Sequence, residues 1–169
     1  HGRMLLQLGC SAGQGYAIPR PMAADALRAW RERWRPPVSW QRCSPLSGAR
    51  RDLLRARVEH RAWQLAVVKY LQSIGNAPPE MDPAQCYLGR ALAQAAREGI
   101  ASAGGRLQRC EAMHREVHEH ARALIATYRH SGGRTPDGIE AFRTLSRDLA
   151  GHLSGLLEAA ESDARPEEP

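Results

Sequence analysis

Four long segments with helical periodicity fill most of the chain after residue 49. Their apolar residues recur every three or four positions, as they do along one face of an amphipathic helix. Breaks rich in glycine and proline separate these segments at 75–83, 104–105 and 131–138. Because helices joined by short connections pack against their neighbours in alternating directions, the pattern predicts an all-α fold, an antiparallel four-helix bundle.

The expected helix bounds follow from the same pattern. The first segment spans residues 50–74 and the fourth spans 139–160. The second is expected to begin at Asp82-Pro83, because an aspartate N-cap followed by proline at the first helical position is a favoured helix start. The third is expected to end near Tyr128.

Composition supports a helical fold and argues against nucleic-acid binding. Hydrophobic residues make up 43% of the chain and aromatic residues 5%, and the strong helix formers alanine, leucine and arginine dominate. The formal net charge is +6, but the basic residues are scattered among glutamates and do not interleave with aromatic residues. A groove for single-stranded nucleic acid needs such interleaving, so no nucleic-acid partner is expected.

The chain carries no signal of membrane insertion or of a disulfide framework. No apolar run approaches the roughly 20 residues of a membrane span, and nothing resembles a signal peptide. The four cysteines show no C-x-x-C spacing, and they are spread through a chain large enough to fold without covalent staples. A reducing, cytoplasmic location is therefore expected.

The first 40 residues are organised differently from the rest. They predict the end of a helix, a glycine-rich turn, a brief strand around Gly15–Ile18 and a helix from about Ala23 to Trp34. This order belongs to an α/β unit. Since one strand cannot form a sheet, we expect the chain to be a piece of a longer protein. The expected divisions are a strand-helix remnant at 1–40, a linker at 41–49, the helical bundle at 50–162 and a disordered tail at 163–169.

Two histidines of the third helical segment are spaced to act together. His114 and His118 lie four residues apart, which places them on the same face of a helix, whereas His120 points away from that face. The same face carries the apolar residues of this segment: Cys110, Val117, Ala121, Ile125 and Tyr128. The histidine pair is therefore expected to face the core, where an imidazole needs a hydrogen-bond partner or a metal.

His60 and Cys86 complete a candidate metal site. His60 lies on the core face of the first segment, which also carries Trp63, Val67, Leu71 and Ile74. Cys86 lies near the N-terminus of the second segment, a position that favours the thiolate. Three imidazole nitrogens and one thiolate are ordinary ligands of tetrahedral zinc. The alternative is a core in which the histidines are hydrogen-bonded and the cysteine is inert, and the spacing alone leaves both open.

The spacing of these residues resembles the chemoreceptor zinc-binding (CZB) domain. H-x-x-W falls at His60–Trp63, C-x-L-G at Cys86–Gly89 and H-x-x-x-H at His114–His118. The resemblance covers roughly residues 50 to 160. It implies a four-helix bundle that binds zinc through His60, Cys86, His114 and His118.

Two further positions bear on this resemblance. Ala91 stands where the family usually has a large apolar residue, so looser packing around the site is expected. Cys110, one helical turn before His114, is the one residue that we consider as a substitute ligand.

The N-terminal segment resembles the end of another domain. Gln14, Gly15 and Tyr16, followed by Arg20 and Pro21, match the final strand of an EAL domain, the barrel-shaped cyclic di-GMP phosphodiesterase. In that family the glutamine belongs to the active-site set, so the resemblance makes Gln14 a remnant of that set. The alternative is a chance Q-G-Y in an unrelated loop.

The catalytic part of such a domain is missing from this chain. The family's acidic metal ligands, catalytic lysine and E-A-L motif all lie upstream of the matching segment. Before the linker this chain contains only Asp25 and Glu32 as acidic residues. Hydrolysis of cyclic di-GMP requires a metal pair held by several carboxylates. No enzymatic activity is therefore expected of the chain itself.

Together the two resemblances imply the C-terminal part of a bacterial cyclic di-GMP signalling protein with EAL and GGDEF domains upstream. The expected function is control of that enzyme, in a homodimer, through zinc occupancy or oxidation of Cys86. Two alternatives stay open. One is a structural helical dimerisation module without a regulatory metal. The other is a hydrolase with an open zinc position, for which Glu111 and Glu59 are the candidate general bases.

Overall fold

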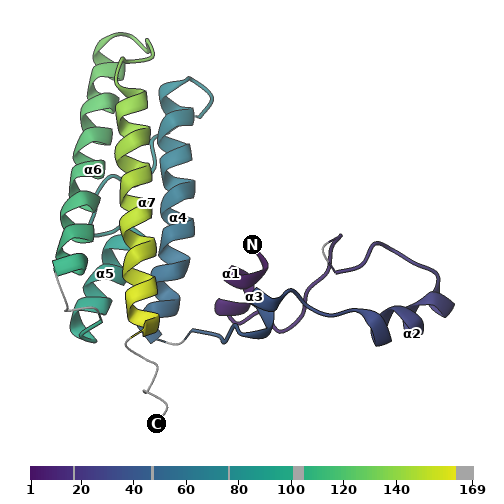
Figure 1. Cartoon of the computed structure of the whole chain (residues 1–169). Helices are drawn as coiled ribbons and strands as arrows, with labels where there is room; N and C mark the ends of the chain where they lie inside the picture. Colours follow the sequence, from purple (N-terminus) through teal and green to yellow (C-terminus); the bar gives the residue numbers. More distant parts are fainter. Residues whose placement is uncertain (17, 47, 76, 101–104, 163–169) are drawn as a thin grey trace. The chain divides into compact units, whose positions relative to one another are not determined.

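The computed structural model describes residues 1–162 apart from 17, 47, 76 and 101–104, and side chains through Glu158 (Figure 1). Within these residues the regular secondary structure is entirely helical, so the predicted all-α class is confirmed for this part of the chain. The predicted tail, 163–169, lies outside the described residues. No described helix combines the length and the apolar character needed to cross a membrane. The chain divides into two compact units, His1–Ser47 and Gly48–Pro169.

The N-terminal unit contains three short helices among its described residues: α1 (Gly2–Gln7), α2 (Ala24–Arg33) and α3 (Val38–Gln41). α1 packs on α3, and a Cβ added to Gly2 would overlap the ring of Trp40. None of the three helices has a buried residue. The helix predicted from about residue 23 to residue 34 is present as α2, with Ala23 as its N-cap and Trp34 as its C-cap.

The strand predicted around Gly15–Ile18 is not found in the described residues, and the chain turns there instead. The Ile18 N–H donates to the Gly15 carbonyl at 2.9 Å, and Tyr16 between them is 80% exposed. Residue 17 lies outside the described residues. A strand is stable only where a neighbouring strand pairs with its backbone groups. Since the described residues contain no other strand, this stretch has no pairing partner among them.

The second unit, called the helical unit below, contains α4 (Gly48–Leu71), α5 (Tyr87–Arg97), α6 (Arg106–His130) and α7 (Ile139–Ser162). α4 packs against the other three helices, and α6 also packs against α5 and α7. Figure 1 shows α4, α6 and α7 side by side along their length. The apolar faces of these helices meet in a shared core. Its largest fully buried apolar side chains are Phe142, Leu53, Leu71, Leu88, Leu92, Leu149 and Leu156.

The second helix of this unit, α5, begins at Tyr87. The predicted start at Asp82-Pro83 is therefore wrong. Asp82 starts a turn, in which its Oδ1 accepts a hydrogen bond from the Ala84 N–H at 2.9 Å. The helix begins only after Cys86, an N-cap with extended backbone angles. The turn folds back over the new helix so closely that a Cβ on Gly89 would overlap the Pro83 carbonyl. This arrangement places Cys86 at the point where the turn enters α5.

α4 ends three residues before the predicted end at Ile74. The Ile74 N–H donates to the Lys69 carbonyl at 2.9 Å and the Ser73 N–H to the Tyr70 carbonyl at 3.1 Å. Ser73 has a left-handed φ of 60°, and together these features form the Schellman motif that terminates many helices. Ile74 is 68% exposed, so it does not extend the core face as predicted.

Candidate metal centre

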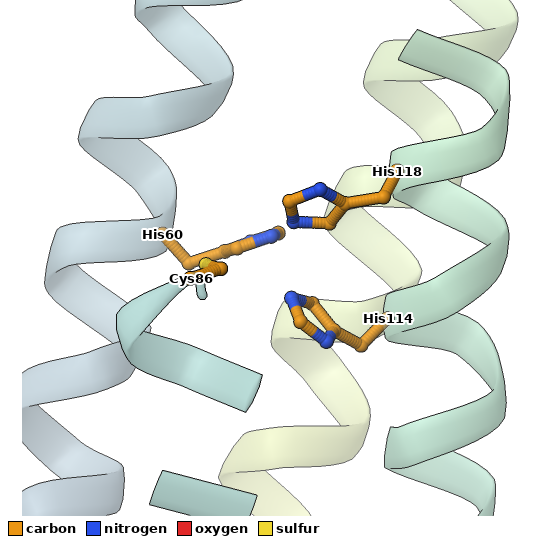
Figure 2. Close-up of side chains that lie close together, drawn as sticks. All are labelled: His60, Cys86, His114 and His118. Carbon is orange, nitrogen blue, oxygen red and sulfur yellow. The ribbon is translucent and has the colours of Figure 1, made fainter. Parts of the chain in front are cut away.

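Four side chains from three helices meet inside the helical unit. His60 comes from α4, Cys86 from the N-cap of α5, and His114 and His118 from α6 (Figure 2). Each offers one donor atom, and these four atoms all lie within 4.8 Å of one another. All four residues are buried, with exposed fractions from 0% for His118 to 8% for Cys86. The cluster could therefore hold a metal ion away from solvent.

The local structure of α6 explains why two ligands come from one helix. Residues four apart lie one above the other on a helix, and His114 and His118 both lie on the buried face. His120 is only partly buried and is not a member of the cluster. The other buried residues of this face are Leu107, Cys110, Met113, Val117, Ala121, Leu124 and Ile125.

Three nitrogens of the cluster lack a hydrogen-bond partner. The Nε2 atoms of His60, His114 and His118 are buried, and none of them has a partner among the described residues. Figure 2 shows the three rings pointing toward one another, so these nitrogens converge. Buried polar atoms are nearly always hydrogen-bonded or bound to an ion. One cation between the rings would satisfy all three nitrogens at once.

A hydrogen bond on the far side of the His118 ring favours this arrangement, and the one at His60 does so once its partner amide is turned over. His118 Nδ1 lies 3.1 Å from the Met81 carbonyl; because a carbonyl can only accept, Nδ1 carries the proton and Nε2 keeps its lone pair. His60 Nδ1 lies 3.1 Å from the amide nitrogen of Gln64. An amide nitrogen can only donate, so in this orientation Nδ1 accepts and Nε2 carries the proton. With the amide turned over, its oxygen accepts from Nδ1–H, and the Nε2 lone pair of His60 is left for a metal.

Trp63 supports the two rings from the side. Its indole stacks on His60, with ring centroids 5.0 Å apart, and on His118 at 4.1 Å. Its Nε1 donates to the Glu80 carbonyl at 2.7 Å, which ties α4 to the loop before α5. The sequence pattern placed Trp63 on the core face but did not show that it contacts two of the histidines.

The surroundings keep the histidines neutral. Burial lowers the pKa of His60 to about 2, with further lowering by His114 and His118. Burial also lowers the pKa of His114 to about 3, aided by His118 and Arg115. The pKa of His118 is lowered by burial as well, although its hydrogen bond to Met81 opposes the change. Neutral imidazoles keep the lone pairs that a metal needs.

Two opposing influences act on the pKa of the Cys86 thiol. Burial raises its pKa, while the backbone N–H groups of Leu88 and Gly89 at the start of α5 lower it. Burial is the larger influence. The helix N-terminus thus favours the thiolate, as predicted, but does not by itself produce one. A bound cation would favour the ionised form of this thiol.

The other candidate residues lie outside the cluster. Cys110 is fully buried, and burial raises its pKa to about 11, but it is not one of the clustered donors. Glu59 is exposed and pairs with Arg55 at 3.8 Å. Glu111 is half-buried and lines a pocket with His114. Gln14 is exposed and belongs to the N-terminal unit.

Sequence reasoning missed two groups that hold the histidines. Gln64 lies four residues after His60, and an amide at that helical spacing was a signal that could have been used. The Met81 carbonyl left no such signal, since a backbone group has no residue type. Ala91, where looser packing was predicted, is buried in α5.

No known protein family, curated protein or solved structure matches this chain. The resemblances to the CZB and EAL domains therefore stay predictions that depend on the motif residues alone.

Proposed function

We propose that the helical unit is an antiparallel four-helix bundle that binds one zinc ion, and that the metal regulates a bacterial cyclic di-GMP enzyme. The observation that carries the proposal is the convergence of three unpartnered, buried imidazole nitrogens and one thiol within 4.8 Å. The resemblance to the CZB domain supports the same four ligands: His60, Cys86, His114 and His118.

The donor set suits zinc better than harder cations. Calcium and magnesium prefer oxygen ligands, whereas zinc takes imidazole nitrogen and thiolate in a tetrahedron. Zinc bonds of about 2.0 Å to nitrogen and about 2.3 Å to sulfur place such donors roughly 3.5 Å apart. Small rotations of the four side chains would bring donors that now lie within 4.8 Å to this spacing.

A filled site of this kind is structural and regulatory. With the Cys86 thiolate and three histidines as ligands, no coordination position is left for water, which a catalytic zinc requires. The metal connects α4, α5 and α6, and so its loss releases the contacts that hold these helices in register. Of the two candidate bases, Glu59 is exposed and paired with Arg55, whereas Glu111 lines a pocket with His114. The hydrolase alternative therefore depends on an open zinc position, which four protein ligands do not leave.

Cys86 is the residue through which an oxidant would act. Without metal, burial keeps its thiol protonated and the nucleophilic thiolate is scarce. In the zinc-bound state the thiolate is present, and hypochlorite would convert it to sulfenic acid with release of chloride. This oxidation removes one of the four donors and weakens metal binding.

The link to cyclic di-GMP rests on the N-terminal segment. Gln14, Gly15, Tyr16, Arg20 and Pro21 match the end of an EAL domain, so the regulated partner is the enzyme in the same polypeptide. The test is phosphodiesterase activity of the full-length protein before and after a chelator or hypochlorite, beside a Cys86→Ala variant. Activity that is indifferent to all three treatments would contradict regulation.

Zinc binding can be tested on this chain by itself. Elemental mass spectrometry should find about one zinc per purified chain, and a His118→Ala variant should lose it. A His130→Ala variant is the control, since His130 is exposed and lies on the same helix. Absence of zinc from the wild type, even after incubation with the metal, would leave the unit as a dimerisation module.

A further inference from the structure

A pocket of about 250 Å³ opens beside the candidate metal centre. Its wall includes Pro83 and Ala84 of the turn before α5, Gly89 of α5, and Glu111, His114 and Arg115 of α6. His114 is the one residue of the four-membered cluster in this lining. The pocket therefore borders the cluster at His114.

Gly89 makes the approach to His114 possible. A Cβ at this position would lie 3.3 Å from His114 Cε1 and would overlap the Pro83 carbonyl. The turn before α5 therefore lies against the bare backbone of Gly89. Any larger residue would crowd the space between this turn and the imidazole.

Glu111 also lines this pocket, and its carboxylate is unpaired among the described residues. It lies three residues before His114, on the same side of α6. Among the described residues it has no hydrogen bond or ion pair, and even Arg115, four residues later, does not pair with it. Carboxylate oxygen is an accepted zinc ligand, so this side chain can hold a cation for a short time.

We propose that this pocket is the route by which the metal ion reaches and leaves the buried cluster, and that Glu111 is a transient ligand on that route. The inference rests on the proposed zinc site. The ion meets Glu111 and His114 together at the pocket, and rotation of the His114 ring then brings it to His60, Cys86 and His118. Release follows the same path in reverse. Arg115, a cation in the same lining, opposes the passage.

This role has a kinetic signature that other roles lack. A group that binds the ion only during passage lowers the barrier in both directions, so its removal slows uptake and release by the same factor. The dissociation constant then stays unchanged. A resident ligand would instead speed up release when removed, and a distant charge would alter uptake alone.

The test compares three variants of the full chain: Glu111→Gln, Arg115→Gln and Glu116→Gln. Glu116→Gln removes the same charge from an exposed position of α6 and is the matched control. The absorbance of 4-(2-pyridylazo)resorcinol reports the zinc that this dye has bound. Release is followed by mixing the zinc-loaded chain with excess dye, and uptake by mixing the metal-free chain with zinc and measuring, after increasing times, the zinc that the dye can still bind at once. The dissociation constant is measured separately by competition.

Relative to the control, Glu111→Gln should slow uptake and release about tenfold each, and Arg115→Gln should speed up both. Rates for Glu111→Gln within a factor of about two of the control, faster release, or an effect on uptake alone would each overturn the proposal. A wild-type chain that binds no zinc would instead overturn the zinc site, and the two failures are therefore distinguishable.

Discussion

The indole of Trp63 lies on the imidazole of His118, with ring centroids 4.1 Å apart and the planes inclined by 23°. The same indole donates to the Glu80 carbonyl at 2.7 Å, next to the Met81 carbonyl that holds His118 Nδ1 at 3.1 Å. Trp63 therefore positions His118 twice, through its ring directly and through the loop behind it.

Replacement of Trp63 by phenylalanine separates these two contributions. The smaller ring keeps apolar contact with the histidines but loses the hydrogen bond to Glu80. We expect the free energy of unfolding of the metal-free chain to fall by about 1 kcal/mol and zinc affinity to fall about tenfold. Denaturant unfolding and competition for zinc provide the two values. Trp30→Phe in the N-terminal unit is the control, and equal affinities in both variants would refute the positioning role.

Gln64 should tune the ligand strength of His60. Gln64→Ala removes the hydrogen-bond partner of His60 Nδ1, and we expect a loss of zinc affinity of about 10- to 100-fold. Gln64→Glu should restore the affinity, because a carboxylate oxygen accepts a hydrogen bond from the Nδ1–H of His60 more strongly than an amide oxygen does. Gln108→Ala, at an exposed position of α6, is the matched control. If Gln64→Ala binds zinc as tightly as Gln108→Ala, the hydrogen bond has no part in binding.

Acid should destabilise the metal-free chain. The pKa of His60 is about 2 and that of His114 about 3 in the folded state, against the ordinary value of 6.5. Since these pKa values are lowered, the unfolded chain binds more protons below pH 6.5, and stability is present above that pH and lost as pH falls. Each histidine should contribute a loss of about 1.4 kcal/mol by pH 5.5.

The measurement is denaturant unfolding of the metal-free chain at pH 7.5, 6.5 and 5.5. His152→Gln, which changes an exposed histidine of α7, should keep the wild-type pH dependence. His60→Gln should reduce the loss of stability between pH 7.5 and 5.5 by about 1.4 kcal/mol, since the contribution of His114 remains. A wild-type chain equally stable at pH 7.5 and 5.5 would show that the buried histidines are protonated without cost.

Removal of the metal should lower stability of the zinc-loaded chain. A ligand that binds only the folded state stabilises it by about 4 kcal/mol when its free concentration is about 1,000 times the dissociation constant. Thermal unfolding with and without a strong chelator measures the difference. Because zinc connects α4, α5 and α6 in the proposed site, identical melting temperatures would favour a metal-free structural module.

Ser146 offers a test of core packing away from the metal. It is 4% exposed, and its hydroxyl has no hydrogen-bond partner among the described residues. A buried hydroxyl without a partner is unfavourable, so Ser146→Ala should leave stability unchanged or raise it by about 1 kcal/mol. Ser154→Ala, which removes the hydroxyl that accepts from Arg57 at 2.7 Å, should lower it. In denaturant unfolding, a loss of stability for Ser146→Ala or a gain for Ser154→Ala would contradict this interpretation of the core.

Much of the helical unit could be predicted from the sequence because its signals are local. Helical periodicity identified α4, α6 and α7, and the spacing of four residues identified one inward face shared by His114 and His118. These inferences need only the 3.6-residue repeat. The start of α5 was mistaken, since Asp82-Pro83 is as favourable in a turn as at a helix start, and packing over Gly89 decides between the two.

The sequence by itself determined the helical class, the inward histidines and the type of donor atoms available. Only the tertiary structure decided that His60, Cys86, His114 and His118 meet within 4.8 Å, because their convergence depends on how three helices pack. It also decided which groups hold the rings: Trp63 across two histidines, Gln64 on one, and a backbone carbonyl of Met81 on another. Such contacts join residues far apart in the chain, and periodicity along one helix carries no information about its neighbours.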